Sequence, residues 1–261
     1  MSSTEKPLAD EHRSVAAIYE SGDIAGSYLD KRMQFSWQRM LHDRQVAILK
    51  DAFQRASPQR VLEVAPGPAR LSVELPGVRR GTMVENSEEM IAIARNRLQR
   101  AGLAAAWEVI CGNAFELTKH VPADSFDFAY TFRFLRHFRT PEREQLYDML
   151  RQSLRPQGLL VFDVVGETVL KEVEAKNPTR SASEIAIYDV AFTPDSFRQE
   201  MRKNGFEVVR MDPILRHFGL QSLLSYKLDD VVGPVISPLM RLLELVPSGA
   251  PLEWVAVCRK A

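Results

Sequence analysis

The stretch VLEVAPGPARL, residues Val61–Leu71, is an apolar run that breaks at a Pro-Gly-Pro turn and then resumes with helix-like spacing. This pattern predicts a strand, a tight turn and a helix. Such a turn can hold a dinucleotide pyrophosphate, but that site uses several backbone N–H donors and the spacing G-x-G-x-x-G. Pro66 and Pro68 have no N–H to donate. The turn therefore favours a ligand that approaches the backbone closely and needs little anion binding.

Predicted strands and helices alternate on both sides of this turn. Since sequential strands joined by helices form parallel sheets, the alternation predicts an α/β fold with a doubly wound, seven-stranded, mostly parallel sheet. After the strand that begins at Val61, we expect strands over 81–85, 107–114, 125–132, 158–165, 206–211 and 251–260, and helices over 36–53, 86–102, 140–154 and 193–205.

Polar residues at helix starts suggest where two of these helices begin. Asn86 and Glu89 suit the cap and third positions of one helix, and Gly102 suits its exit. Thr140 suits the cap of the next helix, with Pro141 at its first position.

Two parts of the chain fall outside the alternation. We expect residues 1–58 to form an N-terminal tail and helical lid, and residues 59–261 to form one domain. That domain carries a polar insertion at 166–191 and a longer apolar insertion at 214–250. Ligand-specific surface in such folds is usually carried by loops and insertions.

Composition excludes several classes of protein. Lys plus Arg and Asp plus Glu both number 34, so no overall positive field attracts nucleic acid. Cys111 and Cys258 lie far apart without metal-ligand spacing, which predicts two buried, reduced thiols and no metal site. The polar N-terminus and the absence of a run of about 18 apolar residues argue against a signal peptide and a membrane span. We therefore expect a cytoplasmic protein.

Glu85 ends the strand predicted over 81–85, directly before a helix. An acidic side chain at this position can accept hydrogen bonds from the hydroxyl groups of a ribose. Adenosine without a pyrophosphate fits both this glutamate and the proline-containing turn.

From Val61 to Arg210 the chain resembles the class I S-adenosylmethionine (SAM)-dependent methyltransferases, which have a Rossmann-like fold. The family has an acidic residue followed by three alternating glycines, and here Glu63 and Gly67 match the acid and the middle glycine. Ala65 and Ala69 replace the outer glycines, which we expect to be tolerated at negative φ. Glu85 matches the ribose-binding acid. Further matching segments are GNAFEL (112–117), SFDFAYTFRFLRHF (125–138), LRPQGLLVFDVV (154–165) and FTPDSFRQEMRKNGFEVV (192–209).

The resemblance implies SAM as cofactor and assigns a site. Asn113 would lie beside the adenine amino group, where the family has an aspartate. The residues expected to bind the cofactor are Arg32, Glu63, Ala65, Gly67, Glu85, Asn86, Met90, Asn113, Ala114 and Thr131.

The resemblance also places the acceptor beyond the strand at 125–132. His137 is the expected catalytic residue, as a general base whose ordinary pKa lies near neutrality. The residues expected to bind the acceptor are Tyr28, Phe132, Arg133 and Tyr188. Tyr28 and Arg32 are four residues apart and share one face if helical.

Three functions compete. The leading one is methyl transfer to a small, largely apolar acceptor, with O-, N- and C-methylation left open. The alternative is a non-catalytic protein that binds SAM or its product and regulates a partner. The third candidate is a nicotinamide-dependent dehydrogenase. It ranks last because the turn contains two prolines and lacks the G-x-G-x-x-G spacing of dinucleotide sites. We expect the apolar insertion at 214–250 to cover the acceptor; a membrane-surface contact or a homodimer interface would use the same residues.

Overall fold

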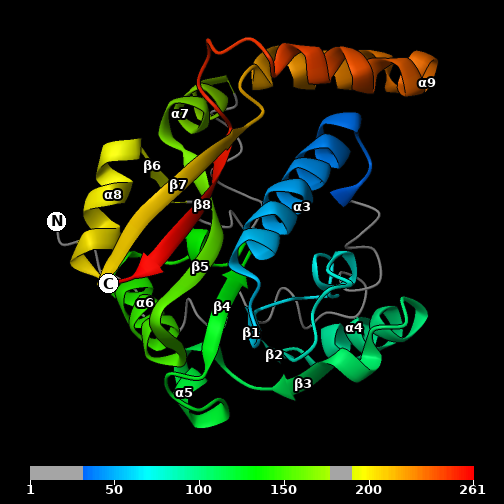
Figure 1. Cartoon of the computed structure of the whole chain (residues 1–261). Coiled ribbons are helices and arrows are strands. Elements are labelled where there is room, and N and C mark those ends of the chain that lie inside the picture. The colour runs from blue at the N-terminus through cyan, green and yellow to red at the C-terminus, as the bar shows by residue number, and fades with distance from the viewer. Residues whose placement is uncertain (1–31, 177–189) are drawn as a thin grey trace, which may run out of the picture.

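The computed structural model of the chain describes residues 32–176 and 190–261, with only the backbone described over 230–237 (Figure 1). Tyr28, Tyr188 and most of the expected N-terminal lid lie outside the described residues.

One sheet forms the centre of the molecule, with strand order β3-β2-β1-β4-β5-β8-β7. The five strands β1 to β5 run parallel, and β8 pairs antiparallel with both β5 and β7. A two-residue strand, β6, pairs with β5 and is an addition to the seven predicted strands. The strands are β1 (Val61–Val64), β2 (Gly81–Glu85), β3 (Trp107–Cys111), β4 (Phe126–Thr131), β5 (Leu154–Gly166), β6 (Ala191–Phe192), β7 (Phe206–Ile214) and β8 (Glu253–Lys260).

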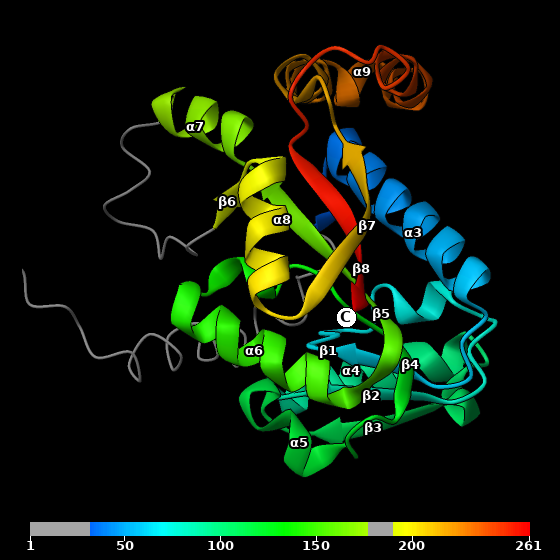
Figure 2. The same ribbon diagram turned by 60° about the vertical axis from the view of Figure 1, so that its left-hand side comes forward.

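Helices cover both faces of the sheet, as Figure 2 shows. Apolar side chains of α3 and α4 join one buried cluster, and those of α5, α6 and α8 join a second. This confirms the doubly wound α/β fold. The helices are α3 (Ser36–Ala56), α4 (Glu88–Arg100), α5 (Leu117–His120), α6 (Thr140–Ser153), α7 (Glu167–Lys176), α8 (Pro194–Lys203) and α9 (Phe218–Leu243), with 3₁₀ turns at Ser72–Glu74, Ala104–Ala106, Ala114–Glu116 and Leu135–His137.

Two helix starts differ from the predicted ones by one residue. Ser87, rather than Asn86, caps α4, because its hydroxyl accepts a hydrogen bond from the N–H of Met90 at 3.2 Å. The N-cap of α6 is Arg139 rather than Thr140, and its N–H donates to the Glu142 carboxylate at 2.7 Å. In both cases a side chain near the first turn satisfies an N–H that the helix leaves open.

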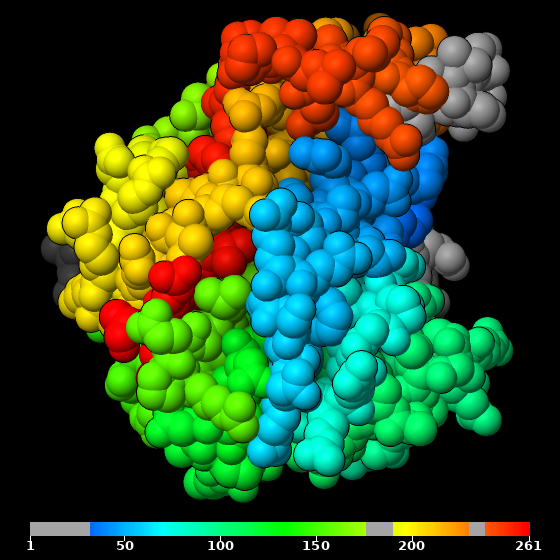
Figure 3. Space-filling model, in the orientation of Figure 1, coloured from blue at the N-terminus to red at the C-terminus, as the bar shows by residue number. Residues whose placement is uncertain are grey.

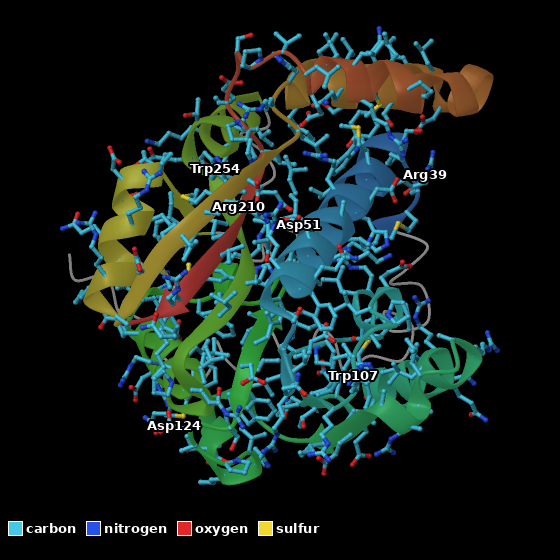
Figure 4. The ribbon with its side chains drawn as sticks, in the orientation of Figure 1. Arg39, Asp51, Trp107, Asp124, Arg210 and Trp254 are labelled. Carbon is cyan, nitrogen blue, oxygen red and sulfur yellow. The ribbon has the colours of Figure 1, made fainter. Side chains whose placement is uncertain are left out.

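Helix α3 is fixed to the main domain by a polar contact as well as by apolar packing. Arg210 on β7 points toward Asp51 on α3, and its Nη1 donates to Oδ2 at 2.7 Å (Figure 4). The apolar residues of α3 belong to the same buried cluster as β1 and β8.

The apolar insertion forms a helical hairpin. Gln221 near the start of α9 donates to the carbonyl of Met240 at 3.3 Å. In a straight helix these residues would lie about 28 Å apart, so α9 must fold back on itself. This α9 hairpin packs across the end of α3 and forms a ridge along one end of the molecule (Figure 3).

The turn after β1 has an unusual backbone. Ala65, Gly67 and Ala69 all adopt positive φ, at 53°, 55° and 55°. The negative φ at which alanine would be tolerated without strain is therefore not adopted at either position. A Cβ in this left-handed region costs about 1–2 kcal/mol, which must be offset by the surrounding contacts. Among these, the N–H of Ala65 donates to Val84 at 2.9 Å.

Replacing Ala65 with glycine should relieve this strain. We expect Ala65→Gly to raise the free energy of unfolding by about 0.5–1 kcal/mol, because the glycine's greater unfolded-state entropy offsets part of the gain. The matched control is Ala92→Gly, at an exposed position of α4 with negative φ, which should lower that free energy by about 1 kcal/mol. Urea unfolding measures both. Equal losses from the two substitutions would contradict the left-handed conformation at Ala65.

Candidate functional site

A cavity of about 190 Å³ lies where β1, β2, β3 and β4 end. Its walls come from the turn after β1, the end of β2 with the start of α4, and the segments that follow β3 and β4. In doubly wound sheets ligands bind beyond the carboxyl ends of the strands. The structure brings eleven of the predicted site residues to this cavity: Glu63, Ala65, Gly67, Glu85, Asn86, Met90, Asn113, Ala114, Phe132, Arg133 and His137.

Glu85 joins two walls of the cavity. Its Oε2 accepts from the N–H of Gly67 at 2.8 Å, and its Oε1 accepts from the N–H groups of Asn86 and Ser87 at 2.9 and 3.1 Å. Burial raises the pKa of this carboxyl, and the three backbone donors oppose that rise. A carboxylate has about four acceptor positions. The described donors occupy two positions on Oε1 and one on Oε2, and Glu85 lines the cavity.

Glu63 lies deeper and has a different environment. Both hydrogen bonds it receives from described residues go to Oε2, one from the Ser72 hydroxyl and one from the Tyr130 hydroxyl at 2.9 Å. Burial is the main effect on this group and raises its pKa from 4.5 to about 7. The carboxyl is therefore poised to gain or lose a proton near neutral pH.

Asn113 and Met90 lie on the side of the cavity formed by β2 and β3. Asn113 is exposed, and its Oδ1 accepts from the N–H of Phe115 at 2.9 Å, which begins the 3₁₀ turn Ala114–Glu116. Met90 is buried while lining the cavity. Both residues can therefore contact a ligand without moving.

An aromatic wall was not predicted. Phe115, Phe134 and Phe138 line the cavity and contact one another edge to face, with ring centroids 5.3 Å apart for Phe115–Phe138 and 5.0 Å for Phe134–Phe138. The sequence signal was the crowding of aromatic residues in FRFLRHF (132–138). Phe115 gave no such signal, because it comes from a different segment.

The segment after β4 is held by buried ion pairs. Asp163 accepts from the N–H of Arg133 at 2.5 Å and pairs with Arg136 at 3.1 Å. Arg136 also pairs with Glu253 at 3.1 Å. Arg133 itself adopts a positive φ of 58°, an uncommon conformation that its hydrogen bond to Asp163 helps to maintain. His137 follows, buried against the cavity.

Arg70 is a second residue that the sequence analysis missed. It lines the cavity, and its guanidinium contacts Nδ1 of His42 at 2.6 Å and donates to Oε1 of Gln45 at 3.0 Å. Burial and the neighbouring Arg70 charge lower the pKa of His42 to about 4. These contacts connect the glycine-containing turn to α3.

Several predicted residues are not brought to the cavity. Thr131 is the last residue of β4, is fully buried and does not line the cavity, and Arg32 does not line it either. Tyr28 and Tyr188 lie outside the described residues. Among the described residues of the α9 hairpin, none lines the cavity. The described part of the insertion at 214–250 packs on α3 instead, so its expected role as a cover for the acceptor stays a prediction.

The cysteines differ from each other. Cys258 is buried as expected, whereas Cys111 is exposed at the end of β3. The expectation of two buried thiols is thus wrong for Cys111, since β3 is an edge strand. Across residues 32–176 and 190–261, no group of three or more acidic, histidine or cysteine side chains could hold a metal ion. In the same ranges, no helix has the length and apolarity needed to cross a membrane.

Comparison with known proteins confirms the resemblance. Residues 61–158 match the family model described as "Methyltransferase domain". A search of curated proteins found no match to the sequence. Among solved structures, a SAM-dependent methyltransferase from Thermotoga maritima is 20% identical, with a TM-score of 0.58 over 91% of this chain and 98% of the other.

Two further solved structures share the fold. Mitomycin 7-O-methyltransferase is 15% identical, with a TM-score of 0.56 over 84% of this chain and 53% of the other. A [4+2]-cyclase is 17% identical, with a TM-score of 0.54 over 81% of this chain and 79% of the other. The chain thus has the fold of class I SAM-dependent methyltransferases, and that fold also occurs in a protein named for a different reaction.

The pKa of Glu63 predicts how stability depends on pH. Because the folded chain holds this proton more tightly than the unfolded chain, its contribution to stability is complete below pH 4.5 and is lost as pH rises through 7. We expect the stability of Glu63→Gln relative to the intact chain to rise by about 3 kcal/mol between pH 4.5 and 8.5. Urea unfolding across that range measures the difference. Exposed Glu108→Gln is the control and should follow the intact chain; a constant difference for Glu63→Gln would contradict the assignment.

Proposed function

From the class I methyltransferase fold, we propose that this chain binds SAM in the cavity and transfers its methyl group to a small, largely apolar acceptor. The main support for this proposal is the position of the Glu85 carboxylate. Its carboxylate stands at the end of β2, lines the cavity and receives on Oε2 one hydrogen bond from the described residues, that of the Gly67 N–H. The second acceptor position of Oε2 would take a ribose hydroxyl.

The remaining residues fit the other parts of the cofactor. Asn113 and Met90 would flank the adenine, and the closely approaching turn at Gly67 would face the ribose and the amino acid portion. Glu63 would receive the methionine ammonium group. An ammonium beside Glu63 favours the ionised carboxylate, so binding should release a proton when the pH is below about 7.

Bound SAM supplies a methyl group already activated by its sulfonium. The protein's part is then to orient the acceptor and exclude water. Phe132 and the aromatic wall of Phe115, Phe134 and Phe138 give the acceptor an apolar surface. His137 would take the acceptor's proton where the acceptor is a phenol or an amine, and Arg133 would orient its polar group.

The alternative, a non-catalytic protein that binds SAM or its product, uses the same cofactor site. Formation of S-adenosylhomocysteine with a panel of small phenols, amines and carboxylic acids favours the enzyme. A cell extract can be added as a wider source of acceptors. Tight cofactor binding with no methyl transfer, even with that extract, favours the alternative.

Glu85→Gln should weaken binding of S-adenosylhomocysteine roughly tenfold or more, because one charge-assisted hydrogen bond is worth about 1.5–3 kcal/mol. Isothermal titration calorimetry measures the affinity. Glu88→Gln, an exposed acid three residues further along the chain, is the matched control and should bind as the intact chain does.

A second ligand separates ribose binding from damage to the turn. The 2′-deoxy analogue of S-adenosylhomocysteine should bind the intact chain more weakly and should lose little further affinity in Glu85→Gln. Equal losses for both ligands would mean that Glu85 acts only by holding the backbone, and unchanged affinity in a folded variant would overturn its role.

A further inference from the structure

The α9 hairpin meets the body of the protein with polar as well as apolar side chains, since Phe218, Leu228 and Met240 pack with the core beneath it. Toward the body of the protein it presents polar groups: Asp229 accepts from the N–H of Ser36 at 2.6 Å and from the Ser225 hydroxyl at 2.7 Å. The N–H of Trp37 donates to the Ser225 hydroxyl at 3.3 Å. Gln221 of the same helix is fully buried. Surface helices normally turn their apolar face inward. Here the inward face of the first half combines the packing of Phe218 and Leu228 with these hydrogen bonds, and further apolar side chains are left on the outer face.

The outward face of the hairpin is apolar. Successive residues of a helix are about 100° apart, so Leu220 and Leu223 project within about 60° of each other and on the side away from Ser225. In the second half of the hairpin, Leu239 and Leu242 likewise project within about 60° of each other, on the side away from the buried Met240. These leucines are 48–59% exposed, Tyr226 is 56% exposed, and Leu245 just beyond the helix is 77% exposed. Both halves therefore contribute to one unusually apolar end of the molecule.

Among the hairpin side chains that the structure describes, the exposed charged ones are basic. Lys227 is exposed beside Tyr226, and the Arg241 side chain, which pairs with Asp43 on α3, is 65% exposed. The described acids face inward instead: the Asp229 side chain is only 12% exposed, and Glu244 accepts from Gln221 at 2.7 Å. Lys227 projects within about 40° of Leu223, so the exposed apolar face carries a basic group. Arg241 lies beside that face, on the side that meets α3.

We propose that the α9 hairpin docks on the surface of an anionic lipid bilayer, with its leucines in the headgroup region and its basic side chains on the lipid phosphates. Leucine-rich helices with basic flanks lie in this way at membrane interfaces. A second copy of the chain fits less well, because a two-fold pairing of this face would bring the lysines and arginines of both copies together. The proposal does not depend on methyl transfer, since the described hairpin residues do not line the cavity.

Co-sedimentation of the full chain with 100 nm vesicles tests the proposal. Vesicles of phosphatidylcholine and phosphatidylserine at 3:1 should bind the chain more tightly than vesicles of phosphatidylcholine alone, and added salt should reduce the difference. Leu223→Ser with Leu242→Ser should lower the affinity more than tenfold. Lys227→Gln, which leaves the apolar face intact, should lower affinity for the anionic vesicles by about fivefold.

The matched control is Val209→Ser on β7, a 46% exposed apolar residue away from the hairpin, which should leave vesicle binding unchanged. Failure of the intact chain to bind either vesicle overturns the proposal. If sedimentation velocity then shows a dimer that the double leucine variant dissociates, the face is a self-association surface instead. Vesicle binding that survives both the leucine and the lysine substitutions also overturns the assignment to α9.

Discussion

The carboxylate of Glu85 is the interaction on which the rest of the site depends. It receives three backbone N–H groups from two separate segments, one from Gly67 in the turn after β1 and two from Asn86 and Ser87 at the start of α4. Hydrogen bonds to an ionised acceptor are stronger than those between neutral groups, and the buried carboxylate makes them costly to break. The turn and the helix start are thereby fixed relative to each other, and the cavity between them is preformed.

The two glutamates that line the cavity, Glu63 and Glu85, receive different hydrogen-bond donors: backbone N–H groups at Glu85 and side-chain hydroxyls at Glu63. Burial raises the pKa of both carboxyls. At Glu85 three backbone donors oppose the rise, whereas at Glu63 burial outweighs the two hydroxyl donors and raises the pKa to about 7. A group that is neutral in the empty site and ionised beside a cation couples proton release to binding. The same burial that lowers stability at high pH therefore makes Glu63 responsive to a positively charged ligand.

The sequence predicted the regular parts of this structure well, because each rests on local chemistry. The strand at 81–85 has the predicted bounds, and the helix predicted over 193–205 is α8 (Pro194–Lys203), with Thr193 as its N-cap. Gly67 and Glu85 reach the cavity because parallel strands end at one edge of the sheet. Conformations that depend on contacts between distant segments were harder to predict.

Three misses show this limit. The positive φ of Ala65 and Ala69 contradicts the intrinsic preference of alanine and is imposed by the surrounding structure. Arg70 and Phe115 reach the cavity through packing that no periodicity reveals. The insertion at 214–250 was expected to cover the acceptor because its apolar residues exceed what one loop can bury in itself, yet α9 packs on α3 with polar as well as apolar side chains. Binary patterning cannot tell which face of such a helix finds hydrogen-bond partners.

The central claim is that this cavity binds the adenosyl amino acid with its ammonium group at Glu63. Calorimetric titration of the intact chain with S-adenosylhomocysteine, in buffers of different ionisation enthalpy, tests it most directly. We expect one bound ligand per chain, with release of most of one proton at pH 6 and almost none at pH 8.5. Binding without a pH-dependent proton release would contradict the placement at Glu63. An absence of binding, or preferential binding of a nicotinamide dinucleotide, would contradict the account of the cavity as a whole.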